Sequence, residues 1–185
     1  MLSLDGKVIV QRTVWQDDIG FLAVRNPQRS QALRRQGEFA LGRTTIDLMF
    51  HDEDRALLAR PLYAFLTVAP RSERWPAPRP VWFELTQDGD LQMFSLPDAP
   101  KLDRLRKHPR ASVVVAAPPG EPEHWVSVEG SVTLRDEGGA ELAARLAERY
   151  YDMSDPSHQK LVDEWCAGGV IRIVVHPEVV NRYSA

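Results

Sequence analysis

A β-hairpin signal near the middle of the chain constrains the fold more than any other feature. Two β-prone and largely apolar runs, residues 80–86 and 91–95, flank the tetrapeptide Gln87-Asp88-Gly89-Asp90. An Asp-Gly pair between such runs is among the stronger sequence signals for a tight hairpin. We therefore expect two neighbouring antiparallel strands, followed by a loop and a short basic helix that begins at Pro100.

The remaining elements indicate a barrel rather than a doubly wound sheet. Four more segments have the composition of strands: residues 63–69, 111–117, 125–134 and 170–175. Three more helices are expected at residues 52–59, 138–151 and 156–167. Six strands with helices between them, and no strict strand–helix alternation, favour a mainly β (α+β) fold, an antiparallel barrel with flanking helices. Gly130 lies on the apolar side of its strand, where an interior glycine most often marks a β-bulge.

Length and composition bound the number of domains. The chain has 185 residues, of which 43% are hydrophobic, and this is enough apolar material for one compact core. The sequence changes character near residue 46. Residues 1–45 are polar and weakly periodic apart from a strand-like piece at residues 7–14, and they predict an N-terminal extension. Residues 46–185 are expected to form the barrel domain.

Charge and cysteine content argue against several classes of protein. The formal net charge is −3, whereas a nucleic-acid partner usually requires a net basic face. Cys166 is the single cysteine, so neither an internal disulfide nor a cysteine metal site is expected, and the five histidines have no metal-ligand spacing. The chain has no apolar run of about 20 residues. We expect a cytoplasmic protein that binds neither membrane nor metal.

The loop after the hairpin has the residue types that hold a phosphate group. Lys101 supplies positive charge and Ser95 a hydroxyl. If Pro100 is the first helical residue, Ala99 is the N-cap, and its methyl group cannot satisfy the free amides of the first turn. A bound phosphate could do so, helped by the helix dipole. In the alternative interpretation, Asp98 is the cap and Lys101 is a solvated side chain.

The order and spacing of several segments resemble the pyridoxamine 5′-phosphate oxidase-like superfamily of FMN-binding split β-barrels, which includes deazaflavin-dependent oxidoreductases. The matching residues are 64–68, 80–83, Ser95, Lys101, Leu102, Leu105, Pro109, Arg110, 126–130, 171–173 and Pro177. The resemblance begins at about residue 50 and does not include residues 1–45. It implies a six-stranded antiparallel split β-barrel.

The resemblance also implies a flavin site with named residues. In such proteins the strand that corresponds to Val81 and Trp82 runs along the edge of the flavin ring, and a nearby basic residue, here Arg79, meets the phosphate or a ring carbonyl. Ser95 and Lys101 complete the expected cofactor site. Ala99 departs from the serine or threonine that is common there. A homodimer with a cofactor cleft at the subunit interface is implied as well.

We therefore expect a flavin-dependent oxidoreductase that transfers hydride between the cofactor and a small organic substrate. FMN is the preferred cofactor because the predicted site requires one phosphate, and the deazaflavin coenzyme F-420 is the alternative. No catalytic side chain is assigned. True pyridoxamine phosphate oxidation is not expected, because residues 179–183 do not supply clear contacts for a substrate phosphate. Two other functions stay open: a non-catalytic carrier of flavin or tetrapyrrole, and a family member with an unfilled pocket.

Overall fold

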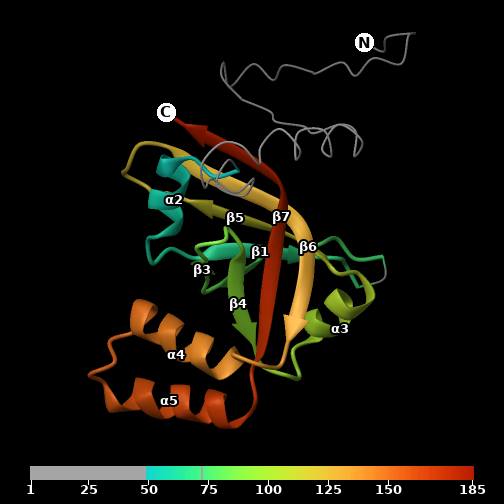
Figure 1. The fold of residues 1–185 in the computed structure, drawn as a ribbon, viewed down its shortest axis with the longest axis vertical. Helices are drawn as coiled ribbons and strands as arrows, with labels where there is room; N and C mark the ends of the chain where they lie inside the picture. Colours follow the sequence, from blue (N-terminus) through green and yellow to red (C-terminus); the bar gives the residue numbers. More distant parts are fainter. Residues whose placement is uncertain (1–48, 72) are drawn as a thin grey trace, which may run out of the picture.

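Seven strands form one curved antiparallel sheet in the computed structural model, which describes residues 49–71 and 73–185 (Figure 1). The strands are β1 (Ala64–Val68), β2 (Arg79–Val81), β3 (Glu84–Leu85), β4 (Leu91–Ser95), β5 (Arg110–Ala116), β6 (His124–Arg135) and β7 (Ile171–Ser184). Their order in the sheet is β2-β1-β5-β6-β7-β4-β3. The predicted mainly β fold, an antiparallel split barrel with flanking helices, is confirmed.

The strand count is seven rather than six because the predicted strand 80–86 is broken. Its first part, β2, pairs with β1, and its second part, β3, pairs with β4 at the other edge of the sheet. Trp82 and Phe83 make the crossing between the two edges. The hairpin prediction holds for β3 and β4: the Thr86 amide donates to the Asp90 carbonyl at 2.9 Å, and Gly89 has φ of 84°.

The long strands β6 and β7 carry the curvature of the sheet. Their register shifts between Glu129 and Gly130, so that Glu129 lies opposite Val179 and Gly130 opposite Pro177. The predicted bulge at Gly130 is therefore confirmed. The position has no room for a side chain, because a Cβ atom on Gly130 would lie 2.0 Å from the carbonyl oxygen of His176.

Four helices flank the sheet in the described part of the chain. They are α2 (Asp52–Leu58), α3 (Pro100–Lys107), α4 (Gly139–Tyr150) and α5 (Pro156–Ala167), and each lies where the sequence predicts a helix. The core lies on the concave side of the sheet, where Leu57 and Leu58 of α2 and Leu102 and Leu105 of α3 meet the inward valines of β5 and β6.

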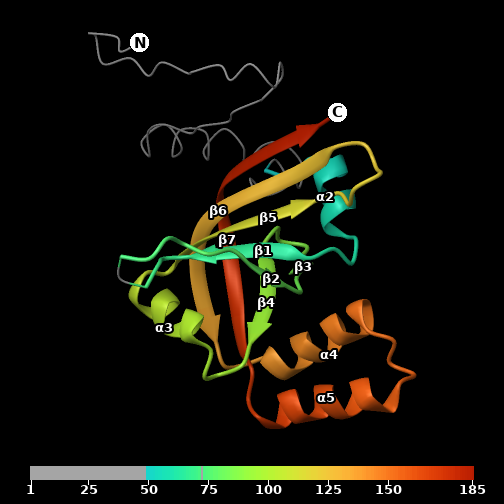
Figure 2. The same ribbon diagram turned by 180° about the vertical axis from the view of Figure 1, so that it is seen from behind.

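Helices α4 and α5 pack against each other beyond the end of β4, as the front and back views agree (Figure 1, Figure 2). Leu142 and Leu146 of α4 are fully buried, whereas Val162 is the one buried residue of α5. Helix α4 is thus anchored in the body of the protein, and α5 is held mainly through α4.

The predicted N-terminal extension, with its strand at residues 7–14, lies outside the described residues, and the predicted domain boundary near residue 46 stays a prediction. In the part of the chain that is described, no helix is long and apolar enough to cross a membrane.

Candidate functional site

An aromatic cavity of about 500 Å³ lies where the sheet edge meets the α4–α5 pair. It is lined by Tyr63, Phe65, Pro80, Val81, Trp82, Phe94 and Trp165. These residues come from β1 and the residue before it, β2, β4, the crossing between β2 and β3, and α5. The predicted site residues Val81 and Trp82 therefore lie together in one cavity wall.

Trp82 is held in place by a cluster of aromatic rings. It stacks on Tyr150 of α4, with 5.1 Å between ring centroids and 6° between ring planes, and it meets the edge of Tyr151 at 4.5 Å. The Tyr150 hydroxyl donates to the Leu62 carbonyl at 2.6 Å, which fixes the ring on which Trp82 rests. Burial raises the pKa of Tyr150, so this hydroxyl stays a donor over the physiological pH range.

The far wall of the cavity is also aromatic. Trp165 of α5 packs against Phe94 of β4 at 5.5 Å and against Trp82 at 5.8 Å between ring centroids. Tyr63 and Phe65, on the rim, are 58% and 46% exposed. Among the described residues no charged side chain lines the cavity, and the polar groups of its lining side chains are one phenol and two indole N–H groups.

Lys101 is a partly buried cation that has no carboxylate partner in the described part of the chain. It is half-buried in the first turn of α3, and burial together with the nearby Arg104 guanidinium lowers the pKa of its ammonium group. Among residues 49–71 and 73–185, no carboxylate pairs with it. Arg104 turns away to the carbonyls of Pro100 and Ala69, at 3.3 Å each. A partly buried charge without a partner loses hydration without compensation, so an anionic ligand would stabilise this position.

At the start of α3 the first of the two interpretations of the sequence holds, and Asp98 is not the cap. Ala99 is the N-cap with Pro100 in the first turn, and no side chain caps the free amides. Ser95, 3% exposed, donates its hydroxyl hydrogen to the Leu96 carbonyl at 3.2 Å. Its side chain lies on the face of β4 that Met93 shares, opposite the face from which Phe94 enters the aromatic cavity.

Arg79 lies at the α3 end of the sheet edge. It is exposed, and it pairs across β2 and β1 with Leu66. Just beyond the same end of β1, the Ala69 carbonyl accepts from Arg104 of α3. Trp82 follows the other end of β2, three residues and thus roughly 10 Å away from Arg79.

The structure does not bring the five predicted residues together at one point. Val81 and Trp82 line the aromatic cavity, and Arg79 and Lys101 lie toward α3. Ser95 belongs to neither wall: it ends β4, and its hydroxyl donates to the Leu96 carbonyl. The cofactor role of each residue stays a prediction. The other aromatic residues of the cavity, Tyr63, Phe65, Phe94 and Trp165, were not predicted. One signal was available: outward-facing Phe65 and Phe94 interrupt the polar alternation expected of a half-exposed strand.

The fold and site define a class: a split β-barrel with an aromatic cavity at one sheet edge and, at the start of a neighbouring helix, a cation that no carboxylate of the described residues pairs with. The sequence profile of the pyridoxamine 5′-phosphate oxidase family matches residues 50–164, which is more than half of the chain. The chain therefore belongs to the pyridoxamine 5′-phosphate oxidase family of flavin-binding split barrels. It has no match among curated protein sequences.

Solved structures share the fold at low sequence identity. A conserved hypothetical protein of Mycobacterium tuberculosis has a TM-score of 0.61 at 14% identity, over 77% of this chain and 89% of that one. An F420 reductase has a TM-score of 0.55 at 23% identity, over 68% and 94%. The haem storage protein HutZ of Vibrio cholerae has a TM-score of 0.53 at 15% identity, over 71% and 92%. These likenesses establish the fold alone.

Proposed function

We propose that the protein is a flavin-dependent oxidoreductase that transfers hydride between a bound flavin and a small organic substrate. The observation that carries the proposal is Lys101, a desolvated ammonium group without an ionic partner in the described residues, beside uncapped helix amides. A flavin phosphate supplies the missing anion at both features. Membership of a flavin-binding family supports the same assignment.

In this proposal the cofactor lies along β2. Lys101 and the α3 amides bind the phosphate, with Arg79 as a second cation at the same end of the strand. The backbone at Val81 borders the ring, and Trp82 limits its far side. A bound flavin accepts or donates two electrons as hydride. The contribution of the chain is to position the reactants and to exclude water, which the apolar walls do without an acid or base.

FMN is the proposed cofactor, and F-420 is the alternative. One desolvated lysine matches one phosphate, which favours FMN. The similarity to an F420 reductase keeps the deazaflavin open. We also propose a homodimer, because aromatic side chains on the cavity rim, Tyr63 and Phe65, are exposed in the single chain.

Titration of the cofactor-free protein with FMN tests the assignment. Lys101→Met should weaken FMN binding by about 10- to 100-fold, the range for loss of a charge-assisted hydrogen bond. Lys107→Met is the matched control, because Lys107 is exposed at the other end of the same helix. Equal FMN affinity in the wild type and in Lys101→Met would contradict the proposed site.

A non-catalytic carrier is the second candidate, and the similarity to a haem storage protein is the observation that favours it. None of the histidines in the described part of the chain lines the aromatic cavity, so an axial ligand for haem would have to come from elsewhere. Spectroscopy of the loaded protein separates the two candidates. An enzyme is bleached by an electron donor and reoxidised by an acceptor at a catalytic rate, whereas a carrier keeps its pigment without turnover.

A further inference from the structure

We propose that two arginines beside the start of α4, Arg135 and Arg172, form a binding site for a phosphate group. The two residues are register partners at the end of β6 and the beginning of β7. Register partners on antiparallel strands point to the same face of the sheet, so the pair sets two positive charges side by side. Like charges in directly opposite positions destabilise a sheet, and an anion bound between them would remove this repulsion.

The described part of the chain provides no partner for either guanidinium group. Neither side chain forms a hydrogen bond or an ion pair within it. Arg172 is partly buried, and its Nε atom is buried without an acceptor. The acids that follow Arg135, Asp136 and Glu137, are exposed, and among residues 49–71 and 73–185 neither forms an ion pair with an arginine. An anion would therefore stabilise this pair.

The start of α4 adds positive charge at the same point, and both ribbon views show it beside the end of β6 and the beginning of β7 (Figure 1, Figure 2). The Arg172 guanidinium lies against Gly138, the N-cap of α4, where a Cβ atom would be 3.1 Å from Nη1. The partial positive charge of a helix N-terminus repels a cation in this position. Gly138 has no side chain with which to cap the free amides of the first turn, so these amides are further donors for an anion that the arginines hold.

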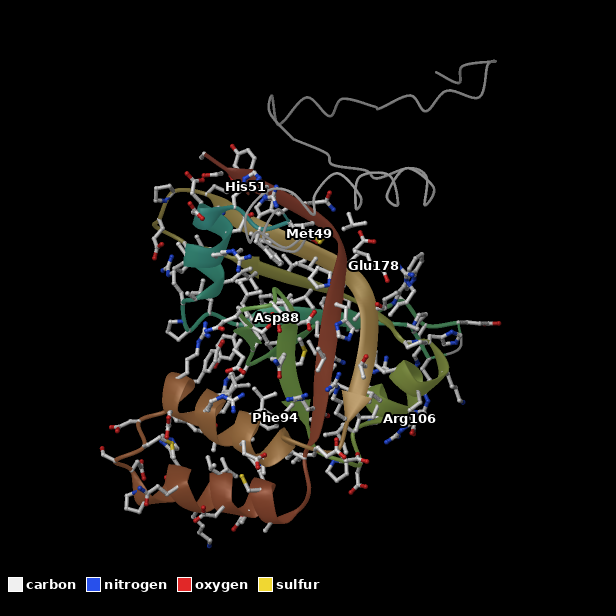
Figure 3. All side chains as sticks on the ribbon, viewed as in Figure 1. Met49, His51, Asp88, Phe94, Arg106 and Glu178 are labelled. Atoms are coloured by element: carbon white, nitrogen blue, oxygen red, sulfur yellow. The ribbon has the colours of Figure 1, made fainter. Side chains whose placement is uncertain are left out.

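The arginine pair is separate from the proposed binding site for the cofactor phosphate. Arg172 is the register partner of Phe94, which Figure 3 shows between the sheet and the α4–α5 pair. Helix α3, which carries Lys101, packs through Leu102 and Leu105 against the opposite, core-facing side of the sheet. The arginine site therefore does not depend on the proposed oxidoreductase function.

Two guanidinium groups favour a phosphate group over a carboxylate. A carboxylate has two oxygen atoms, and a single arginine fork can engage both of them. A phosphate group has three acceptor oxygen atoms and a charge of about −1.5 to −2 at pH 7, so it can accept hydrogen bonds from both arginines and from the helix amides. The free phosphate ion and the phosphate group of a larger molecule share this chemistry.

Isothermal titration and thermal unfolding of the full chain with sodium phosphate test the inference. The starting protein is Lys101→Met, which removes the lysine of the proposed cofactor site. Phosphate should bind it and raise its unfolding temperature, whereas sodium chloride at equal ionic strength should not. Adding Arg172→Gln should weaken phosphate binding by about tenfold or more, because charge-assisted hydrogen bonds are lost. Adding Arg106→Gln is the matched control, because Arg106 is exposed on α3, and it should leave phosphate binding unchanged.

Arg135→Gln provides a second test that does not disturb a buried group, because Arg135 is exposed. Without phosphate this substitution should raise the unfolding temperature, since it removes one of two like charges. With phosphate it should reduce the rise that the ion produces, and a purely structural arginine would not show this reversal. The inference is overturned if Arg172→Gln binds phosphate as the starting protein does, or if Arg135→Gln lowers the unfolding temperature in the absence of phosphate. Acetate that binds as tightly as phosphate would also overturn it.

Two further titrations identify the source of the phosphate group and separate this inference from the proposed function. Binding of glycerol 3-phosphate as tightly as free phosphate would assign the site to the phosphate group of a larger molecule, and weaker binding would assign it to the free ion. FMN should bind Arg172→Gln and the wild type equally. If FMN does not bind the wild type but phosphate behaves as expected, the proposed function fails and the arginine site stands. If Lys101→Met alone abolishes phosphate binding, the ion belongs to the proposed cofactor site, and the separate site is overturned.

Discussion

The protonation state of Lys101 links cofactor binding to pH. Burial and Arg104 lower the pKa of this ammonium group in the free protein, and a bound phosphate would favour its charged form. As pH rises through the lowered pKa, FMN binding must take up a proton, so affinity should fall. Below about pH 6 the phosphate loses its second charge, and affinity should fall again. A titration series from pH 5 to pH 10 should therefore give a bell-shaped affinity profile.

Replacement of Lys101 provides the control for this profile. Lys101→Met should remove the fall in FMN affinity at alkaline pH. It should keep the fall at acidic pH, because that fall arises from protonation of the phosphate. The same substitution should raise the urea midpoint at pH 7, because an unfolded chain binds the lysine proton more readily than the folded protein does. An alkaline limb that persists in Lys101→Met would assign the titration to another group.

The bulge at Gly130 is the element on which the curvature of β6 depends. A methyl group there would lie 2.0 Å from the His176 carbonyl oxygen, a backbone atom of the paired strand that cannot yield as a side chain can. Gly130→Ala should thus destabilise the protein by about 1–3 kcal/mol or more, measured by urea denaturation. Gly168→Ala is the control: its nearest contact is 3.3 Å and its φ is −76°, so stability should change by less than about 0.5 kcal/mol. Similar effects of the two substitutions would show that the bulge tolerates a side chain.

Local sequence signals located most helices and strands. They failed where contacts between residues distant in the sequence determine the structure. The Asp88-Gly89 turn, the Pro100 helix start and the Gly130 bulge each follow from backbone preferences within a few residues, and each is confirmed. The break between β2 and β3 has a non-local cause. Trp82 stacks on Tyr150, and its neighbour Phe83 is fully buried. An apolar run alone cannot reveal a ring that packs on it from almost seventy residues away.

At the scale of the whole molecule, most of the candidate site could not be predicted from the sequence, because its walls meet only in the folded chain. Val81 and Trp82, which line the cavity, could be named from the sequence because they lie in one short segment that resembles the family. The remaining walls come from Tyr63 to Trp165, and they meet only because the sheet order places β1, β2 and β4 near the α4–α5 pair. Aromatic residues scattered over a hundred positions carry no common spacing, so the cavity could be found only from the fold.

Assembly of two chains is the remaining prediction, and it concerns the uncovered face of the sheet. Phe65 of β1 and Val114 of β5 are register partners on the convex side, and Phe65 is 46% exposed. If the cofactor cleft is completed by a second copy, a charge at Val114 should disrupt both the dimer and the cleft. We expect a wild-type dimer in sedimentation velocity. Val114→Glu should sediment as a monomer with at least about tenfold weaker FMN binding, because a buried unpaired carboxylate is costly.

Ala167→Glu is the matched control for this prediction, because Ala167 is exposed at the end of α5, away from β5. It adds the same charge and should leave both the dimer and the FMN affinity unchanged. FMN affinity of the wild type should also rise with protein concentration until the dimer is fully formed, since a site shared by two chains exists only in the dimer. A wild-type monomer that binds FMN with one concentration-independent affinity would instead place the whole cofactor site within a single chain.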